Sequence, residues 1–241
     1  MSLLSLQGVN KRYTDGPRER VVLRDASLDV EAGELVVVWG LRRSGRSTLL
    51  RVASGIEAPD SGLVLFDGRD LAEDGEDVLG GGIGYCRKTL RSNEGATALD
   101  EIMVGLLARG VAPAAARSRA RSALERTGAE HCDGARLGHL DSAEAVRVAL
   151  ARTLALRPRL LVIDEPVNGI DLMERDGILL LLRSLADQGM AVLASAGEPT
   201  ALTGADRAVS LGAGELRAGP QPELAPVVAL RRSPARRQIS G

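Results

Sequence analysis

The sequence is short of aromatic residues, cysteine and lysine, and each shortage narrows the functions to consider. Aromatic side chains make up 2% of the 241 residues and the formal net charge is −1, so we expect neither a base-stacking platform nor a nucleic-acid partner. The two cysteines, Cys86 and Cys132, lack metal-ligand spacing and cannot build a disulfide framework, which favours a reducing compartment. Lys11 and Lys88 are the only lysines, so arginine carries nearly all of the positive charge.

Apolar runs long enough to cross a bilayer, about 20 residues in a helix, are also lacking. The densest run, Ile178 to Leu182, is far shorter than that. Residues 1–10 do not combine a basic segment with an apolar core, so we expect no secretory signal. We therefore expect a cytoplasmic protein that reaches the inner face of the cell membrane only through a partner.

Short strands are predicted near the N-terminus. Leu4 to Val9 and Val21 to Val30 flank a polar loop from Thr14 to Arg20, and this arrangement is typical of an antiparallel edge piece. Leu35 to Trp39 is the first continuous apolar run, as expected of a strand that is covered on both faces.

Helical periodicity replaces the strand pattern in the middle of the chain, over residues 97–109, 113–127 and 144–156. Strands and helices then alternate, which predicts an α/β fold with a parallel sheet. We expect one domain over residues 1–218, with a helical subdomain inserted at about 89–156. Residues 219–241 are rich in proline and arginine and are predicted to be a disordered tail.

A glycine-rich pattern lies between the strand that ends at Trp39 and a helical run that begins at Ser47. In such loops, glycines let backbone N–H groups surround phosphates, a lysine binds the β- and γ-phosphates, and a hydroxyl ligates Mg²⁺. Arg46 stands where the lysine is expected. The residues expected to contact ATP here are Gly40, Ser44, Gly45, Arg46, Ser47 and Thr48.

A second strand end carries two carboxylates. The apolar run Leu160 to Ile163 is followed by Asp164 and Glu165. An aspartate in this place can hold Mg²⁺, and a glutamate can polarise an attacking water. A strand that ends in an acidic turn is also common without such a role, but the glycine loop upstream makes a nucleotide site the better interpretation.

The succession of motifs resembles the nucleotide-binding subunit of an ABC transporter over about the first 218 residues. It is most similar to the small bacterial subunits of the lipoprotein-release and macrolide-export type. Besides the glycine loop, the stretches that carry the resemblance are 11–13, 61–62, 67–68, 147–152, 157–160, 164–166 and 168–171. The resemblance implies a P-loop NTPase fold of the ABC type with an antiparallel β edge piece and an inserted helical subdomain.

The resemblance also implies cofactors, partners and roles. The cofactors would be ATP and Mg²⁺, and the partners would be a membrane-spanning permease and a second ABC subunit, in a homodimer or a heterodimer. Tyr13 would stack on adenine, and Glu165 would be the catalytic base. Ser47 and Asp164 would hold Mg²⁺, and Asp171 would lie at the junction between subunits.

The sequence departs from the family pattern at positions that take part in ATP binding and hydrolysis in the family. Arg46 keeps the charge of the lysine, but its planar fork is longer and differently directed. Lys88 replaces a glutamine that reaches the metal, so its ammonium would repel Mg²⁺ and weaken the dependence on it, and could itself contact ATP by partly neutralising the phosphates in place of the metal. Gly197 replaces the switch histidine and offers neither a donor nor a base.

The signature loop of the family, which closes over the γ-phosphate on the other subunit, is also altered. It aligns with Asp141, Ser142, Ala143 and Glu144. Asp141 places a carboxylate near that phosphate, and Ala143 removes the conformational freedom of a glycine. Asp141 and Glu144 have the spacing of a capping box, so we expect the helix to form while its contact across the dimer is poorer.

Two functions stay open. The chain can be an ATP-binding subunit whose hydrolysis is slow or depends on a partner, or a catalytically inactive pseudo-ATPase scaffold in a heteromeric ABC complex. A third possibility, a soluble ABC-type ATPase acting on nucleic acid or division machinery, is disfavoured for nucleic acid by the near-neutral charge and scarce aromatics.

Overall fold

The computed structural model describes residues 2–15, 18–73, 82–87, 95–198, 201 and 203–218. The predicted tail, 219–241, and the predicted ATP contact Lys88 lie outside these residues. Within the described ranges, no helix combines the length and the apolar character needed to cross a membrane.

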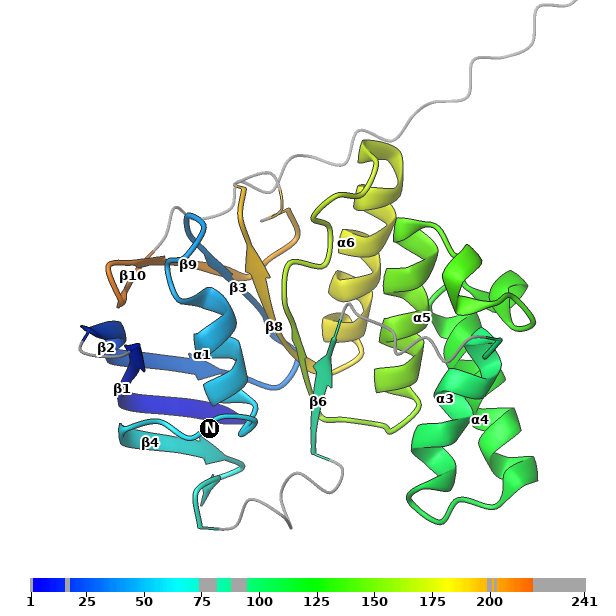
Figure 1. Ribbon diagram of the computed structural model, residues 1–241, viewed down its shortest axis with the longest axis horizontal. Helices are drawn as coiled ribbons and strands as arrows, with labels where there is room; N and C mark the ends of the chain where they lie inside the picture. The colour runs from blue at the N-terminus through cyan, green and yellow to red at the C-terminus, as the bar shows by residue number, and fades with distance from the viewer. Residues whose placement is uncertain are drawn as a thin grey trace, which may run out of the picture.

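A six-stranded sheet with the order β10-β9-β3-β8-β7-β6 forms the centre of the molecule (Figure 1). Its strands are β3 (Leu35–Trp39), β6 (Ile83–Cys86), β7 (Leu160–Ile163), β8 (Ala191–Ala196), β9 (Arg207–Gly212) and β10 (Glu215–Ala218). Only the pairing of β9 with β10 is antiparallel among these described strands. Strands β7 and β8 are buried along their whole length, because helices or the second sheet cover both faces.

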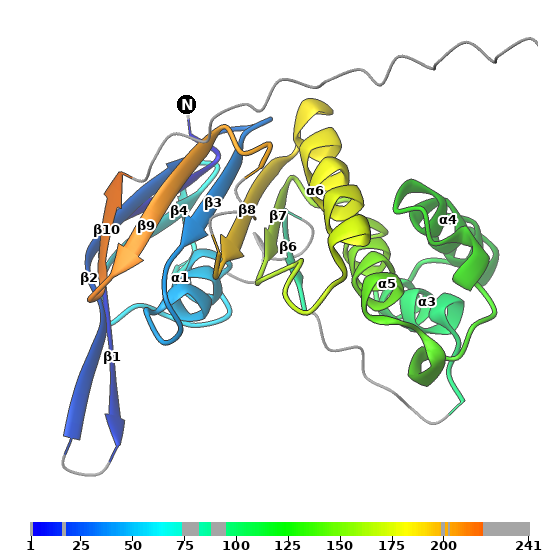
Figure 2. The ribbon, with the colours of Figure 1, turned by 90° about the horizontal axis from the view of Figure 1, so that it is seen from above.

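A second sheet is antiparallel and has the order β2-β1-β4-β5. It consists of β1 (Leu4–Asp15), β2 (Arg18–Val30), β4 (Ser61–Phe66) and β5 (Arg69–Asp70). The predicted loop from Thr14 to Arg20 is wrong, because pairing continues through Tyr13–Arg20 and Thr14–Glu19. These polar residues belong to a two-stranded ribbon that projects from the body (Figure 2), so no buried face imposes an apolar alternation on them.

The helices form two groups. Helix α1 (Arg46–Ala53) packs between the two sheets, and α6 (Leu172–Asp187) covers the opposite face of the central sheet. Helices α3 (Ala98–Leu107), α4 (Pro113–Arg126) and α5 (Ser142–Leu154) share a separate apolar core. Two short 3₁₀ helices, η1 (Glu130–Cys132) and η2 (Leu137–His139), lie between α4 and α5. The fold is therefore the predicted α/β arrangement with an antiparallel edge sheet and inserted helices.

The topology brings three strand ends to one edge of the central sheet. Strand β8 pairs in parallel with β3 on one side and with β7 on the other, with Trp39 opposite Ala196 and Ile163 opposite Ala194. The segments that follow β3, β7 and β8 therefore emerge together, at the edge where ligands bind in parallel α/β sheets.

Candidate functional site

The glycine loop after β3 needs both of its glycines. A Cβ at Gly40 would collide with the carbonyl oxygen of Leu211. Gly45 has φ of 109°, which L side chains rarely adopt, and a Cβ there would lie 2.8 Å from the oxygen of Val22. Gly45 is the N-cap of α1 and offers no capping side chain, so the first N–H groups of this helix point toward the loop without a side-chain acceptor on that cap.

Arg46, the first residue of α1, joins the glycine loop to the end of β7. Its side chain is 6% exposed, and its Nη2 donates to Oε1 of Glu165 over 2.5 Å. The second oxygen of Glu165, Oε2, accepts from Asn168 Nδ2 at 2.7 Å. Both oxygens of the expected catalytic base are therefore engaged by neighbouring side chains.

Asp164 and Glu165 are fixed to the sheet through Ser195 on β8. The Ser195 hydroxyl donates to Asp164 Oδ1 at 2.5 Å and accepts from the backbone N–H of Glu165 at 2.9 Å. Glu165 has φ of 46°, a left-handed conformation that is uncommon for a residue with a side chain. The strand end thus holds both carboxylates in place.

A cavity of about 690 Å³ opens beside this strand end, within the size range of small-molecule sites. Its walls include Ser47, Asp164 and Glu165, together with arginines at positions 42, 43, 46, 51 and 87. Such a concentration of guanidinium groups attracts anions. Cys86 also lines the cavity, and burial raises the pKa of its thiol to about 11, so it is neutral at physiological pH.

Buried polar atoms around the loop have no hydrogen-bond partner within the described part of the chain. They are Trp39 Nε1, Ser44 Oγ and Arg46 Nη1. An unsatisfied buried donor costs about 1–3 kcal/mol, so such atoms favour a ligand that accepts hydrogen bonds. A polyphosphate fits this donor set, and Ser47 with Asp164 supplies oxygen ligands of the kind that Mg²⁺ prefers.

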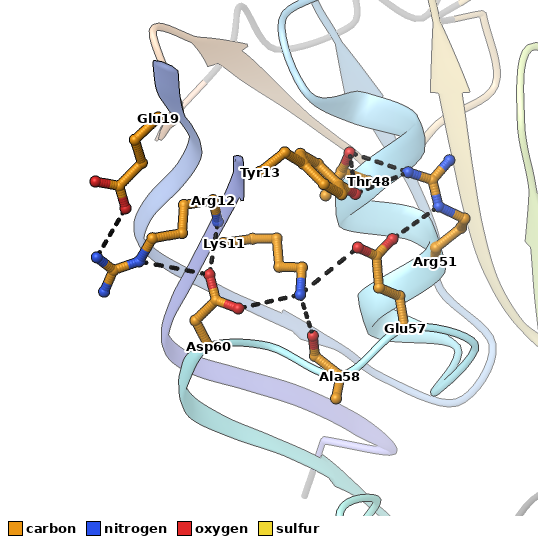
Figure 3. Close-up of polar contacts among 9 residues, drawn as sticks. All are labelled: Lys11, Arg12, Tyr13, Glu19, Thr48, Arg51, Glu57, Ala58 and Asp60. Atoms are coloured by element: carbon orange, nitrogen blue, oxygen red, sulfur yellow. Dashed lines mark hydrogen bonds and ion pairs between the residues drawn. The ribbon is translucent and has the colours of Figure 1, made fainter. Parts of the chain in front are cut away.

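Tyr13, the predicted adenine contact, lies in a polar network across α1 (Figure 3). Its hydroxyl accepts from Arg51 Nη2 at 3.0 Å and lies 3.3 Å from Thr48 Oγ1. Arg51 also donates to Glu57 Oε2 at 3.0 Å. The network anchors the ring at its hydroxyl end and leaves Tyr13 37% exposed, while stacking on adenine stays a prediction.

The start of α5 carries the altered signature loop. Asp141 Oδ1 accepts from the N–H groups of Ala143 and Glu144, each at 2.8 Å. Glu144 Oε2 accepts in return from the N–H of Asp141 at 2.9 Å. The capping box predicted from the spacing is therefore present. Ser142, between them, is exposed.

Other predicted site residues lie around these groups. Gly197 directly follows β8 and faces the ion pair of Arg46 and Glu165, with the position of a Cβ 3.4 Å from Arg46 Nη1. Asp171 is the N-cap of α6 and accepts from the N–H of Met173 at 3.0 Å. Its place at a subunit junction stays a prediction.

A group of possible metal ligands lies outside the cavity. His131 Nε2 is 3.1 Å from Glu144 Oε1, and the Cys132 thiol lies within 4.8 Å of both ligand atoms. Sequence spacing did not reveal this group, because the residues come from η1 and α5. Since Glu144 already bonds His131 and the N–H of Asp141, the group is satisfied without an ion.

Together, the glycine loop, the buried cation and the paired carboxylates at one sheet edge define a P-loop nucleotide-binding protein. The family model described as "ABC transporter" matches residues 23–168, so the chain belongs to the ABC transporter family. Within that family it is an ATP-binding subunit. The fold agrees, because the dimeric ABC transporter cassette MJ0796 matches with a TM-score of 0.81 and 25% identity, covering 89% of this chain and 96% of that one.

Curated relatives agree with the predicted type. The chain is 35% identical over 219 residues to the lipoprotein-releasing system ATP-binding protein LolD of Chromohalobacter salexigens, covering 89% of this chain and 92% of LolD. It is 34% identical over 220 residues to the macrolide export ATP-binding/permease protein MacB 1/2 of Paracoccus denitrificans, covering 89% of this chain but 33% of that protein.

One feature of the site was not predicted from the sequence: Arg46 pairs with Glu165, which is 119 positions away. The pairing depends on the parallel register of β3, β8 and β7. The only signal in the sequence was the joint change of lysine to Arg46 and of histidine to Gly197.

Proposed function

We propose that this chain binds ATP and couples slow or partner-dependent hydrolysis to a membrane-spanning permease. The observation that carries the proposal is the contact of 2.5 Å between Arg46 and Glu165 at the arginine-lined cavity. It puts the cation of the phosphate loop and the expected base within reach of one ligand.

ATP and Mg²⁺ fit the residues present, and bound ATP would supply the phosphoanhydride bond whose hydrolysis drives transport. The N–H groups at the start of α1, with Arg46, would hold the phosphates. Ser47 and Asp164 would hold Mg²⁺. Thr48 and Lys88 complete the predicted contacts, and Lys88 is expected to weaken the dependence on Mg²⁺.

Glu165 would orient a water and take its proton as general base. Arg46 and Asn168 each occupy one acceptor site on its two oxygens, so a water has to approach one of the remaining lone pairs beside these side chains. Turnover by the isolated chain is therefore expected to be slow, and a partner that shifts either side chain would accelerate it.

The start of α5 favours a second candidate, a catalytically inactive scaffold in a heteromeric complex. In a head-to-tail dimer, Ser142 and the first N–H groups of α5 would face the nucleotide on the other subunit. The N–H groups of Ala143 and Glu144 are already bonded to Asp141, whose carboxylate would also repel a phosphate. A heterodimer would place one such impaired contact beside one regular contact, whereas a homodimer would have two impaired contacts.

The partner would be a membrane-spanning permease, which would hold this subunit at the inner face of the cell membrane. LolD belongs by name to a lipoprotein-releasing system, and MacB by name exports macrolides and includes its own permease. We propose export or extraction by analogy with these relatives, with the transported substrate chosen by the permease.

The test is ATP binding and turnover by the purified chain, with and without Mg²⁺, for the natural sequence and for Glu165→Gln. If Glu165 is the base, this change abolishes turnover and leaves binding intact. Glu215→Gln on β10, whose carboxylate pairs with the neighbouring Arg217, is the matched control and should change neither quantity.

Each result separates the candidates. Turnover that disappears in Glu165→Gln supports an ATPase, and binding without any turnover supports the scaffold. Turnover that survives in Glu165→Gln contradicts the assignment of the base, and absence of ATP binding contradicts both candidates.

A further inference from the structure

We infer that Arg46 performs two tasks: Nη2 positions Glu165, and Nη1 is the donor that senses the terminal phosphate. The inference rests on the proposed binding of ATP. It explains why the two changes, to Arg46 and to Gly197, occur in one chain.

The geometry of the guanidinium separates its two ends. Nη2 is bonded to Glu165, whereas Nη1 is buried and has no hydrogen-bond partner among the residues that the structure describes. Leaving a buried, charged donor without a hydrogen bond is costly, and an anion in the site would accept that hydrogen bond. A lysine ammonium is a point charge without this fork and cannot present donors in two fixed directions.

Gly197 provides the space for this arrangement. From the position of its Cβ, the nearest atoms are Arg46 Nη1 at 3.4 Å, Glu165 Oε1 at 3.6 Å and Arg46 Nη2 at 3.7 Å. A methyl group would just fit, but an imidazole projecting from this Cβ toward the ion pair would compete with the guanidinium for the same space. Arg46 and a histidine at position 197 are therefore alternatives.

The pair also lies on the wall between two hollows. Arg46 and Glu165 line the arginine-rich cavity of about 690 Å³ and a neighbouring one of about 440 Å³, which also includes Gly197. A terminal phosphate that reaches this wall would lie beside the guanidinium and would bond Nη1 after a shift of the side chain exposes that buried atom. ADP lacks that phosphate, so Arg46 should determine the preference for ATP over ADP.

The experiment measures dissociation constants of a non-hydrolysable ATP analogue and of ADP for the full chain by calorimetry. We expect Arg46→Lys to reduce the preference for the ATP analogue by about tenfold, the equivalent of one charge-assisted hydrogen bond. Gly197→His should reduce it as well, by displacing the guanidinium. The double variant, Arg46→Lys with Gly197→His, should regain the preference.

The pH dependence provides a second signature. A guanidinium keeps its charge throughout the accessible range, whereas an imidazole loses its charge between about pH 5 and pH 8. Relative to the natural chain at each pH, the regained preference of the double variant should weaken as pH rises, because the neutral imidazole keeps one N–H donor but no charge. Comparison at each pH removes the titration of the nucleotide itself.

Arg217→Lys, an exposed ion-pair residue, and Gly134→His, at an open position, are matched controls that should keep the natural preference. Single-variant effects that multiply in the double variant would overturn the inference, since they would show that positions 46 and 197 act independently. An unchanged preference in Arg46→Lys would overturn it too, even if ATP binds. Absence of ATP binding by the natural chain would refute the proposed function as well.

Discussion

The starts of helices α1 and α5 differ in whether side chains accept hydrogen bonds from their first N–H groups. At α1 the cap is Gly45, no acidic residue lies in the first turn, and Arg46 adds a positive charge. At α5 the cap is Asp141, whose carboxylate accepts from the N–H groups of Ala143 and Glu144, while the carboxylate of Glu144 accepts from the N–H of Asp141. One helix start is open to an external anion, and the other is closed by its own side chains.

From this difference we expect an external anion to bind a helix N-terminus only where the chain leaves its N–H groups unsatisfied. An N-cap carboxylate stabilises the helix by about 1 kcal/mol and is part of the same chain. An external phosphate must displace this carboxylate from the N–H groups and is repelled by its negative charge. We therefore propose that the nucleotide binds at the loop before α1, and we expect a weak contribution from the start of α5.

Removal of the Arg46 charge at the start of α1 should have the largest effect, and the quantity that changes should be ATP affinity. Arg46→Ala loses a charge-assisted hydrogen bond worth about 1.5–3 kcal/mol and leaves Glu165 facing the phosphates, so ATP affinity should fall about 10- to 100-fold. Calorimetric titration of the full chain measures this change. Arg217→Ala, which removes an exposed arginine, is the control, and equal losses in both variants would contradict a specific role for Arg46.

Removal of the cap at the closed end should affect stability instead. Asp141→Ala should lower the free energy of unfolding by about 1 kcal/mol, as measured in urea, and leave the ATP affinity of the isolated chain unchanged. Asp141→Ser restores a capping oxygen without the charge and should recover most of that stability. A fall in affinity in Asp141→Ala comparable to that of Arg46→Ala would erase the distinction between the two ends.

Helix α3 also begins with N–H groups that are bonded by the chain's own side chains, and here we expect the smallest effect on stability. The hydroxyl and the backbone N–H of Thr97 donate to Asp100 and lower the pKa of that carboxyl below its ordinary 3.8. Because the pKa is lower in the folded chain, this stabilisation is present above about pH 4 and is lost as the pH falls through the folded pKa. In Asp100→Asn, the free energy of unfolding should fall less steeply as the pH is lowered below about 4. An unchanged slope in this variant would show that Asp100 does not contribute to acid unfolding.

Local chemistry was predictable from the sequence, and long-range pairing was not. The loop from Gly40 to Thr48 and the capping box at Asp141 were predicted because glycine conformation and side-chain capping act within a few residues. The ribbon from β1 to β2 was missed between Thr14 and Arg20, because polar residues pair there without a buried face. The contact of Arg46 with Glu165 was missed because the register of the central sheet brings them together.

The most direct test uses the single tryptophan, Trp39, which ends β3 immediately before the glycine loop. Its indole nitrogen is buried and finds no hydrogen-bond partner within the described residues, so its fluorescence should respond to a ligand in the loop. Titration with ATP should change the emission of the natural chain and of Asp141→Ala at similar concentrations, and at much higher concentrations in Arg46→Ala. An Asp141→Ala response shifted as far as that of Arg46→Ala, or an Arg46→Ala response equal to the natural one, would contradict the assignment of binding to the open end.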